Sequence, residues 1–172
     1  TVTSANGCTA QATSIVTLNT NVPSVWVNVD NAVLTCTTQS AKLTAYTSWS
    51  DVSFTYKWTG PGGFTATTQS IIATVAGDYI VTITVGTNGC IVKDTATITQ
   101  DIDIPTVTID TDGKNSLCEE GYIYLYPVGD NLNTFKWITP LGESFQAWQL
   151  ATVPGIYTVT ATAYNGCTAE AS

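Results

Sequence analysis

The chain repeats a series of landmarks in one fixed order, and this repetition is the feature that most limits how it can fold. The first landmark is a proline that follows Val or Ile, at Pro23 and again 82 positions later at Pro105. The second is a single cysteine, at Cys36 and again at Cys118, with the same spacing. A period near 80 residues indicates tandem copies of one structural unit.

Two aromatic landmarks follow in each copy. An aromatic-Lys-Trp segment contains Trp58 in the first copy and Trp137 in the second. A Gly-x-Tyr segment contains Tyr79 and Tyr157 in the same way. Side chains alternate between the two faces of a strand, so each Trp faces away from the Lys beside it and toward the interior. We therefore predict that these four aromatic residues belong to the cores of the repeats.

An Asn-Gly-Cys triplet closes each copy, and it occurs at residues 6–8, 88–90 and 165–167. The triplet at residues 6–8 sets the register of the repeats. Cys8 precedes Pro23 by the same 15 positions that separate Cys90 from Pro105. The expected division is residues 1–22 as the C-terminal hairpin of a preceding repeat, 23–104 as a complete repeat, and 105–172 as a second repeat with a truncated last strand.

Composition and turn signals indicate an all-β fold. Residues that suit a pleated surface, such as Thr, Val, Ile and Tyr, outnumber helix formers, and only 10% of the chain is charged. Each unit contains about seven short alternating runs separated by Gly, Pro, Asn and Asp, which is the pattern of a β-sandwich. Asn-Gly is the favoured two-residue hairpin turn, so the strands that flank each Asn-Gly-Cys should pair.

The five cysteines indicate structural disulfides. The chain has no CxxC spacing and no histidine, which favours disulfides in an oxidising compartment over zinc binding or thiol redox chemistry. We predict one disulfide inside each repeat, Cys36–Cys90 and Cys118–Cys167, each closing a loop of about 50 residues worth roughly 4 kcal/mol in the chain-entropy account. Cys8 would pair with a cysteine in the upstream half of its own repeat, and a free or intermolecular thiol is the alternative.

The order of Cys, aromatic-Lys-Trp, Gly-x-Tyr-x-Val-Thr, Asn-Gly-Cys and Pro resembles the extracellular repeats of Bacteroidota surface proteins, including the SprB-type repeats of gliding-motility adhesins. The Gly-x-Tyr-x-Val-Thr strand is also similar to PKD and other immunoglobulin-like modules. This resemblance covers essentially the whole chain. It implies tandem immunoglobulin/PKD-like β-sandwich repeats that form the filament of a large adhesin, exported by a type IX secretion pathway and displayed on the bacterial outer membrane.

Composition also excludes several classes of function. Without histidine the chain has no Ser-His-Asp, Cys-His or histidine-metal site, so we expect no catalytic residues and no enzyme. A net charge of −8 with five basic residues disfavours nucleic acids and anionic membranes. No stretch approaches 18 apolar residues, so we expect no direct membrane insertion. The expected partners are neighbouring repeats of the same chain and an extracellular surface or polysaccharide.

Calcium is the one cofactor that the sequence suggests. Asp101 and Asp103 precede Pro105, and Asp110 and Asp112 follow it within a few positions. Four carboxylates would then meet where two repeats join, and Ca²⁺ prefers such hard oxygen ligands. The alternative is that these aspartates serve solubility and chain reversal, with no cofactor bound.

Two unrepeated tryptophans are the candidate ligand contacts. Trp49 lies in a Ser- and Asp-containing loop, and Trp148 lies in a segment whose counterpart in the first copy has no Trp. An exposed Trp stacks on a sugar ring or anchors a protein partner, but it also packs against a neighbouring repeat. The leading hypothesis is a structural stalk of a cell-surface adhesin. The alternatives are a carbohydrate-binding module that uses these tryptophans and an accessory domain of a secreted hydrolase.

Overall fold

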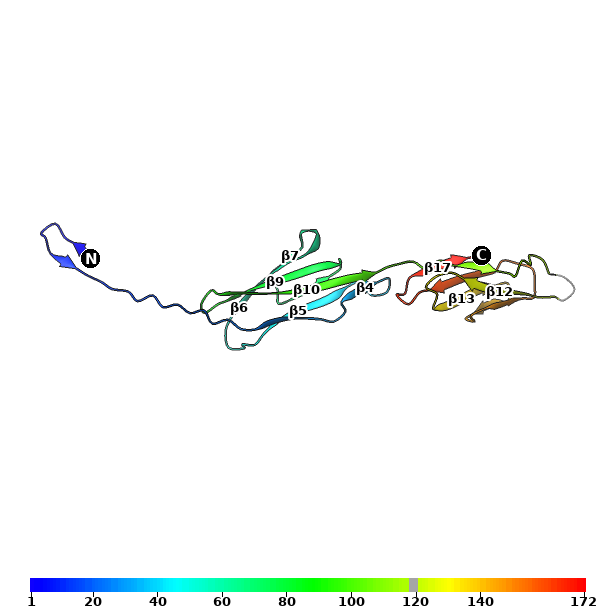
Figure 1. Cartoon of the computed structure of the whole chain (residues 1–172), viewed down its shortest axis with the longest axis horizontal. Coiled ribbons are helices and arrows are strands. Elements are labelled where there is room, and N and C mark those ends of the chain that lie inside the picture. The colour runs from blue at the N-terminus through cyan, green and yellow to red at the C-terminus, as the bar shows by residue number, and fades with distance from the viewer. Residues whose placement is uncertain (118–120) are drawn as a thin grey trace.

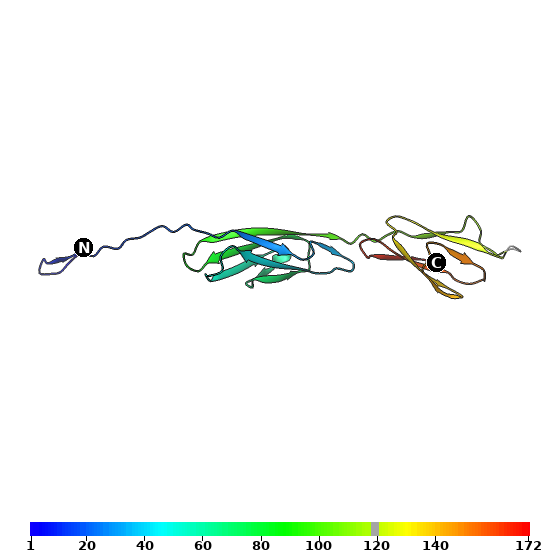
Figure 2. The same ribbon diagram turned by 90° about the horizontal axis from the view of Figure 1, so that it is seen from below.

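The computed structural model describes residues 1–117 and 121–172. Two β-sandwiches lie end to end along one axis, preceded by an extended segment and an N-terminal hairpin (Figure 1). A view turned by 90° shows the same linear arrangement (Figure 2). The molecule is a rod, and the two sandwiches meet at their ends.

Two sheets form the first sandwich. One sheet contains, in spatial order, β3 (Val25–Val29), β5 (Ala41–Thr47) and β8 (Ser70–Ala73). The other contains β4 (Val33–Thr35), β10 (Ile91–Asp101), β9 (Gly77–Val85), β6 (Phe54–Thr59) and β7 (Thr65–Ala66), with the short 3-10 turn η1 (Pro61–Gly63) between β6 and β7. The chain thus crosses from one sheet to the other between β3 and β4, and β4 pairs with β10 in parallel.

The second sandwich repeats this strand pairing, except that no strand among its described residues corresponds to β4. Its smaller sheet contains β11 (Thr108–Asp110), β12 (Ile123–Val128) and β15 (Gln149–Ala151). Its larger sheet contains β14 (Gly142–Ser144), β13 (Thr134–Thr139), β16 (Thr158–Thr162) and β17 (Thr168–Ala171). The prediction of an all-β chain of tandem immunoglobulin-like sandwiches is confirmed.

Each sandwich has a hydrophobic core of its own. The first core includes Leu43 and Val81, and the second includes Leu125 and Val159. Strand alternation produces this burial, because every second residue of β9 from Tyr79 onward faces the interior. A fully buried aliphatic side chain contributes about 1.5–3 kcal/mol. No residue belongs to both cores, so each sandwich is stabilised by its own packing.

Equivalent tryptophans lie at the centre of the two cores. Trp58 on β6 and Trp137 on β13 are both fully buried. The indole Nε1 of Trp58 donates to the backbone oxygen of Thr68 at 2.9 Å, and that of Trp137 donates to the backbone oxygen of Gln146 at 3.2 Å. A buried tryptophan on this strand is a hallmark of immunoglobulin sandwiches.

A tyrosine corner recurs in both sandwiches. The hydroxyl of Tyr79 donates to the backbone oxygen of Val75 at 3.0 Å, and the hydroxyl of Tyr157 donates to that of Val153 at 3.0 Å. Tyr79 is buried, and Phe64 packs edge-on against it with ring centroids 5.5 Å apart. Tyr157 is only half-buried and lines an open cavity of about 460 Å³. The second corner is therefore the more solvated of the two.

The predicted disulfides inside the repeats, Cys36–Cys90 and Cys118–Cys167, are wrong, because Cys36 is bonded to Cys167. The single described disulfide therefore joins the two sandwiches, and the expectation of one disulfide within each repeat fails with it. Cys118 itself lies outside the described residues. In antibody domains the position two residues after the corner tyrosine holds a core cysteine, and here that position holds Val81 and Val159.

The reason for this error is the length of β10. Cys36 directly follows β4, whose Thr35 stands opposite Asp101 at the end of β10. Cys90 directly precedes Ile91 at the start of β10. Extended strand rises about 3.3 Å per residue, so the two ends of β10 are about 33 Å apart. A disulfide needs Cα atoms within about 7 Å.

The N-terminal hairpin has the same register as the last hairpin of the chain. β1 (Val2–Thr3) and β2 (Thr9–Ala10) pair with Thr3 opposite Thr9, and in the β16–β17 pair Thr162 stands opposite Thr168. In both turns the cysteine N–H donates to the asparagine Oδ1. The N···O distance is 3.2 Å in residues 6–8 and 3.0 Å in residues 165–167. That residues 1–22 belong to a preceding repeat stays a prediction.

Candidate functional site: the junction between the sandwiches

The junction is closed by a covalent bond. Cys36 and Cys167 are 131 positions apart in sequence, and their Cα atoms lie 5.1 Å apart across the disulfide. Cys36 extends from the edge strand β4 of the first sandwich, and Cys167 ends the Asn-Gly-Cys turn that leads into β17 of the second. Cys167 is buried at this contact.

Asn165 connects the turn of the second sandwich to the linker that leaves the first. Its Nδ2 donates to Oδ1 of Asp101 at 2.7 Å and to the backbone oxygen of Asp103 at 2.9 Å. Its Oδ1 accepts the N–H of Cys167 at 3.0 Å. The side chain is 6% exposed, so each of these bonds forms largely away from water. One buried amide therefore fixes both the turn and the path of the linker.

A glycine permits the close approach of the two sandwiches. Gly166 has φ +79°, a conformation that favours glycine, and a Cβ added there would lie 2.5 Å from Cγ2 of Thr37. Pro105, which ends the linker, is buried. The disulfide, the amide bonds, the glycine contact and the buried proline together restrict bending at the junction.

Two of the four candidate calcium ligands, Asp101 and Asp110, accept hydrogen bonds through their carboxylates. Asp101 accepts from Asn165, and Oδ1 of Asp110 accepts the N–H of Asp112 at 2.9 Å in a local turn. Within residues 1–117 and 121–172, no group of three or more His, Cys, Asp or Glu side chains is arranged to hold a metal ion. At the junction itself, the carboxylate of Asp101 and the backbone oxygen of Asp103 act as hydrogen-bond acceptors.

The second candidate site is an aromatic strip on the outer face of the second sandwich. Trp148 is 46% exposed and packs edge-on against Tyr124, with ring centroids 5.4 Å apart. Tyr124 also contacts Tyr122 at 5.5 Å and Tyr126 at 6.0 Å. Trp49, in contrast, is half-buried in the loop after β5, where its backbone oxygen accepts from Thr47.

Sequence reasoning missed the three tyrosines of this strip. The signal was present in Tyr-Ile-Tyr-Leu-Tyr at residues 122–126, because alternation that buries Ile123 and Leu125 must turn every tyrosine outward. In the first sandwich a smaller aromatic pair, Trp26 and Tyr46, stacks at 5.8 Å.

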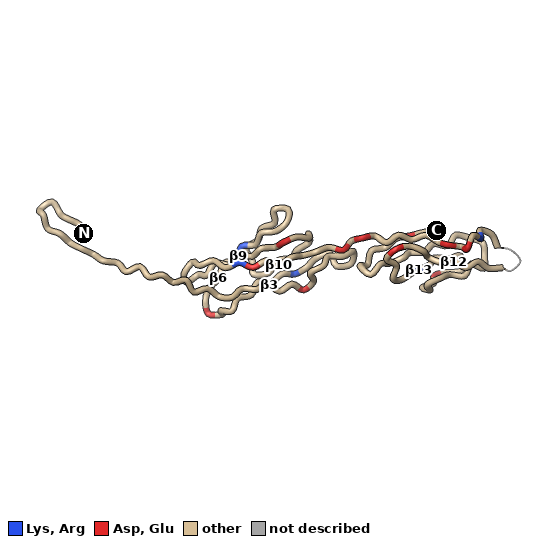
Figure 3. The backbone as a smooth tube through the Cα atoms, viewed as in Figure 1, with Lys and Arg blue, Asp and Glu red and all other residues tan. Residues whose placement is uncertain are grey.

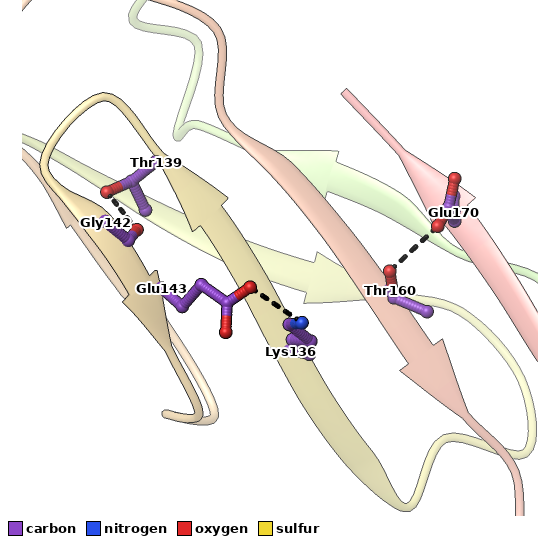
Figure 4. Close-up of polar contacts among 6 residues, drawn as sticks. All are labelled: Lys136, Thr139, Gly142, Glu143, Thr160 and Glu170. Carbon is purple, nitrogen blue, oxygen red and sulfur yellow. Dashed lines mark hydrogen bonds and ion pairs between the residues drawn. The ribbon is translucent and has the colours of Figure 1, made fainter.

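Charges are sparse along the rod (Figure 3). In the described part of the chain the one ion pair joins Lys136 and Glu143 at 2.8 Å, between neighbouring strands β13 and β14 (Figure 4). Thr160 donates to Glu170 at 3.0 Å on the adjoining strands. Both contacts are exposed, and such surface pairs contribute little, about 0–1 kcal/mol. Burial raises the pKa of Tyr56 above its usual value.

Comparisons with known proteins give matches only among solved structures. No protein-family model matches the chain, and no curated protein matches it. Among solved structures, the chain is similar to the three N-terminal domains of the bacteriophage RB49 Highly Immunogenic Outer Capsid protein (Hoc), with 16% identity and a TM-score of 0.48. The match covers 87% of this chain and 57% of the Hoc chain, so it spans little more than half of that structure. No helix among the described residues has the length and apolarity needed to cross a membrane.

Proposed function

We propose that this chain is a non-catalytic stalk segment of a large bacterial cell-surface adhesin, of the kind used in gliding motility, exported by type IX secretion and displayed on the outer membrane. The observation that carries the proposal is the Cys36–Cys167 disulfide, because it joins two sandwiches instead of stapling one. A disulfide inside a domain raises that domain's stability. A disulfide between two domains instead limits how far the whole rod can extend.

The disulfide changes the path of a pulling force. Tension applied at the two ends of the chain reaches Cys36, passes through the sulfur bridge and leaves from Cys167. The residues between them, 37–166, are bypassed, so unfolding of a sandwich adds almost no length. Resistance to extension is what a stalk needs if it is to hold a distal adhesive tip under load.

Single-molecule force spectroscopy on the whole chain, held at its two termini, tests this role. The bridge closes a separation of 131 residues, which span about 450 Å when extended at 3.3–3.6 Å each. We expect the Cys36→Ser variant to extend about 450 Å further than the oxidised wild-type chain. Cys90→Ser is the matched control and should extend like the wild type. Equal extension of the wild type and Cys36→Ser would count against a load-bearing role.

The surface location needs its own test. Antibodies raised against the chain should label intact cells that produce the full protein, and protease added outside those cells should remove the label. Labelling that is seen only after the cells are lysed would exclude display on the cell surface.

A second candidate function is carbohydrate binding by the aromatic strip, and the contact of Trp148 with Tyr124 favours it. Exposed aromatic faces stack on sugar rings, and this strip groups four of them on one sheet face. Glycan-array binding that Trp148→Ala abolishes and Trp26→Ala leaves unchanged would support this function. Binding that both variants retain would exclude the strip as the binding site. An accessory role in a secreted hydrolase has no observation of its own in its favour.

A further inference from the structure

The Asn-Gly-Cys turn of the first sandwich has the same internal geometry as the turn that carries the disulfide. The N–H of Cys90 donates to Oδ1 of Asn88 at 3.1 Å, as that of Cys167 does to Asn165 at 3.0 Å. Gly89 has φ +71°, close to the +79° of Gly166. The Cys90 side chain therefore leaves its turn from the same backbone position as the bonded cysteine.

The linker approaches both turns in the same way. Nδ2 of Asn88 donates to the backbone oxygen of Asn21 at 2.8 Å, and Nδ2 of Asn165 donates to that of Asp103 at 2.9 Å. Asn21 and Asp103 are equivalent, since each stands two positions before its junction proline. The Sγ of Cys90 lies 3.4 Å from the backbone oxygen of Asn19, at the position equivalent to Asp101. Residues 19–21 thus pass the first turn as residues 101–103 pass the second.

The path of the linker determines which part of the preceding sandwich lies against the Asn-Gly-Cys turn. In the described junction the last strand, β10, runs directly into the linker, and β4 ends beside it with Thr35 opposite Asp101. The next residue, Cys36, is thereby placed against the following sandwich. A preceding repeat joined through the linker at residues 11–22 would place its own first cysteine against Cys90.

We infer that Cys90 forms a disulfide with the first cysteine of the preceding repeat, the residue equivalent to Cys36, and that this cross-link recurs at every junction of the array. Cys8 belongs to the repeat that precedes Pro23, and it would bond the first cysteine of the repeat before that one. The inference deepens the proposed stalk function and rests on it for the existence of neighbouring repeats.

Formation of each cross-link is a two-electron oxidation. The two thiols lose two protons and two electrons, and a disulfide oxidant, such as glutathione disulfide or an oxidised dithiol oxidoreductase, accepts both and becomes two thiols. The Cys36–Cys167 bond requires the same chemistry, so no additional kind of reactant is needed for the others.

A series of such cross-links, one at every junction, forms a disulfide ladder. This ladder would allow the array to extend very little. If the cross-link recurs at every junction, a covalent path along the array runs from an Asn-Gly-Cys cysteine to the first cysteine of the following repeat and then across a disulfide. Such a path contains one peptide stretch of 28 positions for every two repeats. Fully extended, 28 residues span about 95 Å. Two folded sandwiches already occupy a comparable length, because β10 alone has 11 residues at about 3.3 Å each. Unfolding of the sandwiches would then lengthen the array very little.

A tandem chain tests the inference directly. Residues 23–104 are placed before residues 23–172, so that Ile104 is followed by Pro23 as it is naturally followed by Pro105. The exposed substitutions Gln39→Asn and Thr87→Ser in the added copy distinguish its peptides by mass. The protein is refolded with glutathione disulfide, and the disulfides are mapped by mass spectrometry without reduction.

We expect Cys36 of the added copy to be linked to Cys90 of the next copy, beside the Cys36–Cys167 link already described. Two results would contradict the inferred cross-link: Cys90 of the second copy remains a thiol although Cys36–Cys167 forms, or Cys36 and Cys90 of one copy join. The proposed stalk function, which depends on the Cys36–Cys167 bond, would stand if that bond still forms. Loss of the Cys36–Cys167 link as well would overturn both proposals. In the Cys90→Ser variant of the second copy, Cys36 of the added copy should remain free.

Discussion

The Nδ2 atom of Asn165 lies 2.7 Å from a carboxylate oxygen of Asp101, so a turn of the second sandwich is hydrogen-bonded to the last strand of the first. Because Asn165 is buried, this contact and its companion to the linker backbone hold the two units in one orientation.

Asn165→Asp should therefore loosen the junction. The substitution removes the Nδ2 donor and places a second carboxylate beside Asp101. Loss of a hydrogen bond to a charged group costs about 1.5–3 kcal/mol. Urea denaturation of the second sandwich should shift to lower concentration. Asn88→Asp is the matched control, because Asn88 faces the neutral backbone oxygen of Asn21, and it should cost less. An equal shift for both variants would contradict the special role of Asp101.

Gly166→Ala should cost more than Gly89→Ala. Both glycines have positive φ, so both substitutions carry a similar backbone strain of about 1–2 kcal/mol. Only the Cβ at position 166 meets a neighbour, Thr37 at 2.5 Å, whereas no atom lies within 4 Å of one at position 89. Overpacking should add about 1–3 kcal/mol, measured as the difference in unfolding free energy between the variants. The double variant Gly166→Ala with Thr37→Ser should recover part of it.

Reduction of the disulfide should leave both sandwiches folded. Each core is closed by its own side chains, with Val81 and Val159 at the positions where antibody domains place a cysteine. In the Cys167→Ser variant we expect the near-ultraviolet circular dichroism of Trp58 and Trp137 to persist, while small-angle X-ray scattering shows a broader range of inter-sandwich angles. Collapse of the tryptophan signal would show instead that the bond stabilises the individual units.

The two tyrosine corners should differ in their contribution to stability. Tyr79→Phe removes a hydroxyl that donates to Val75 from a buried ring, and Tyr157→Phe removes the equivalent hydroxyl from a half-buried one. A lost hydrogen bond costs about 0.5–1.5 kcal/mol and leaves the acceptor unpaired. The ring of Tyr79 is buried, whereas that of Tyr157 lines an open cavity where water can take the place of the lost hydroxyl, so the unfolding free energy should fall further for Tyr79→Phe. The reverse order would mean that the cavity beside Tyr157 does not admit water.

Much of the fold was predictable because its determinants are local. The alternation in residues 54–59 is sufficient to turn Trp58 inward, and the recurrence of Asn-Gly at fixed spacing marks the closing hairpin of each repeat. The outward-facing tyrosines of residues 122–126 were equally readable, but we weighed the unrepeated tryptophans instead. The aromatic strip was therefore predictable from the sequence, although it was not among the predictions.

The sequence by itself determined the all-β class, the repeat register and the inward face of each strand, since these depend on side-chain periodicity and on turn chemistry within a few residues. Only the tertiary structure decided which cysteines meet. That outcome depends on the parallel pairing of β4 with the far end of β10, which places Cys36 about 33 Å from Cys90 along the strand and against the next sandwich. Spacing in sequence carries no record of which end of a sandwich a residue occupies, because that is set by contacts between strands distant in the chain.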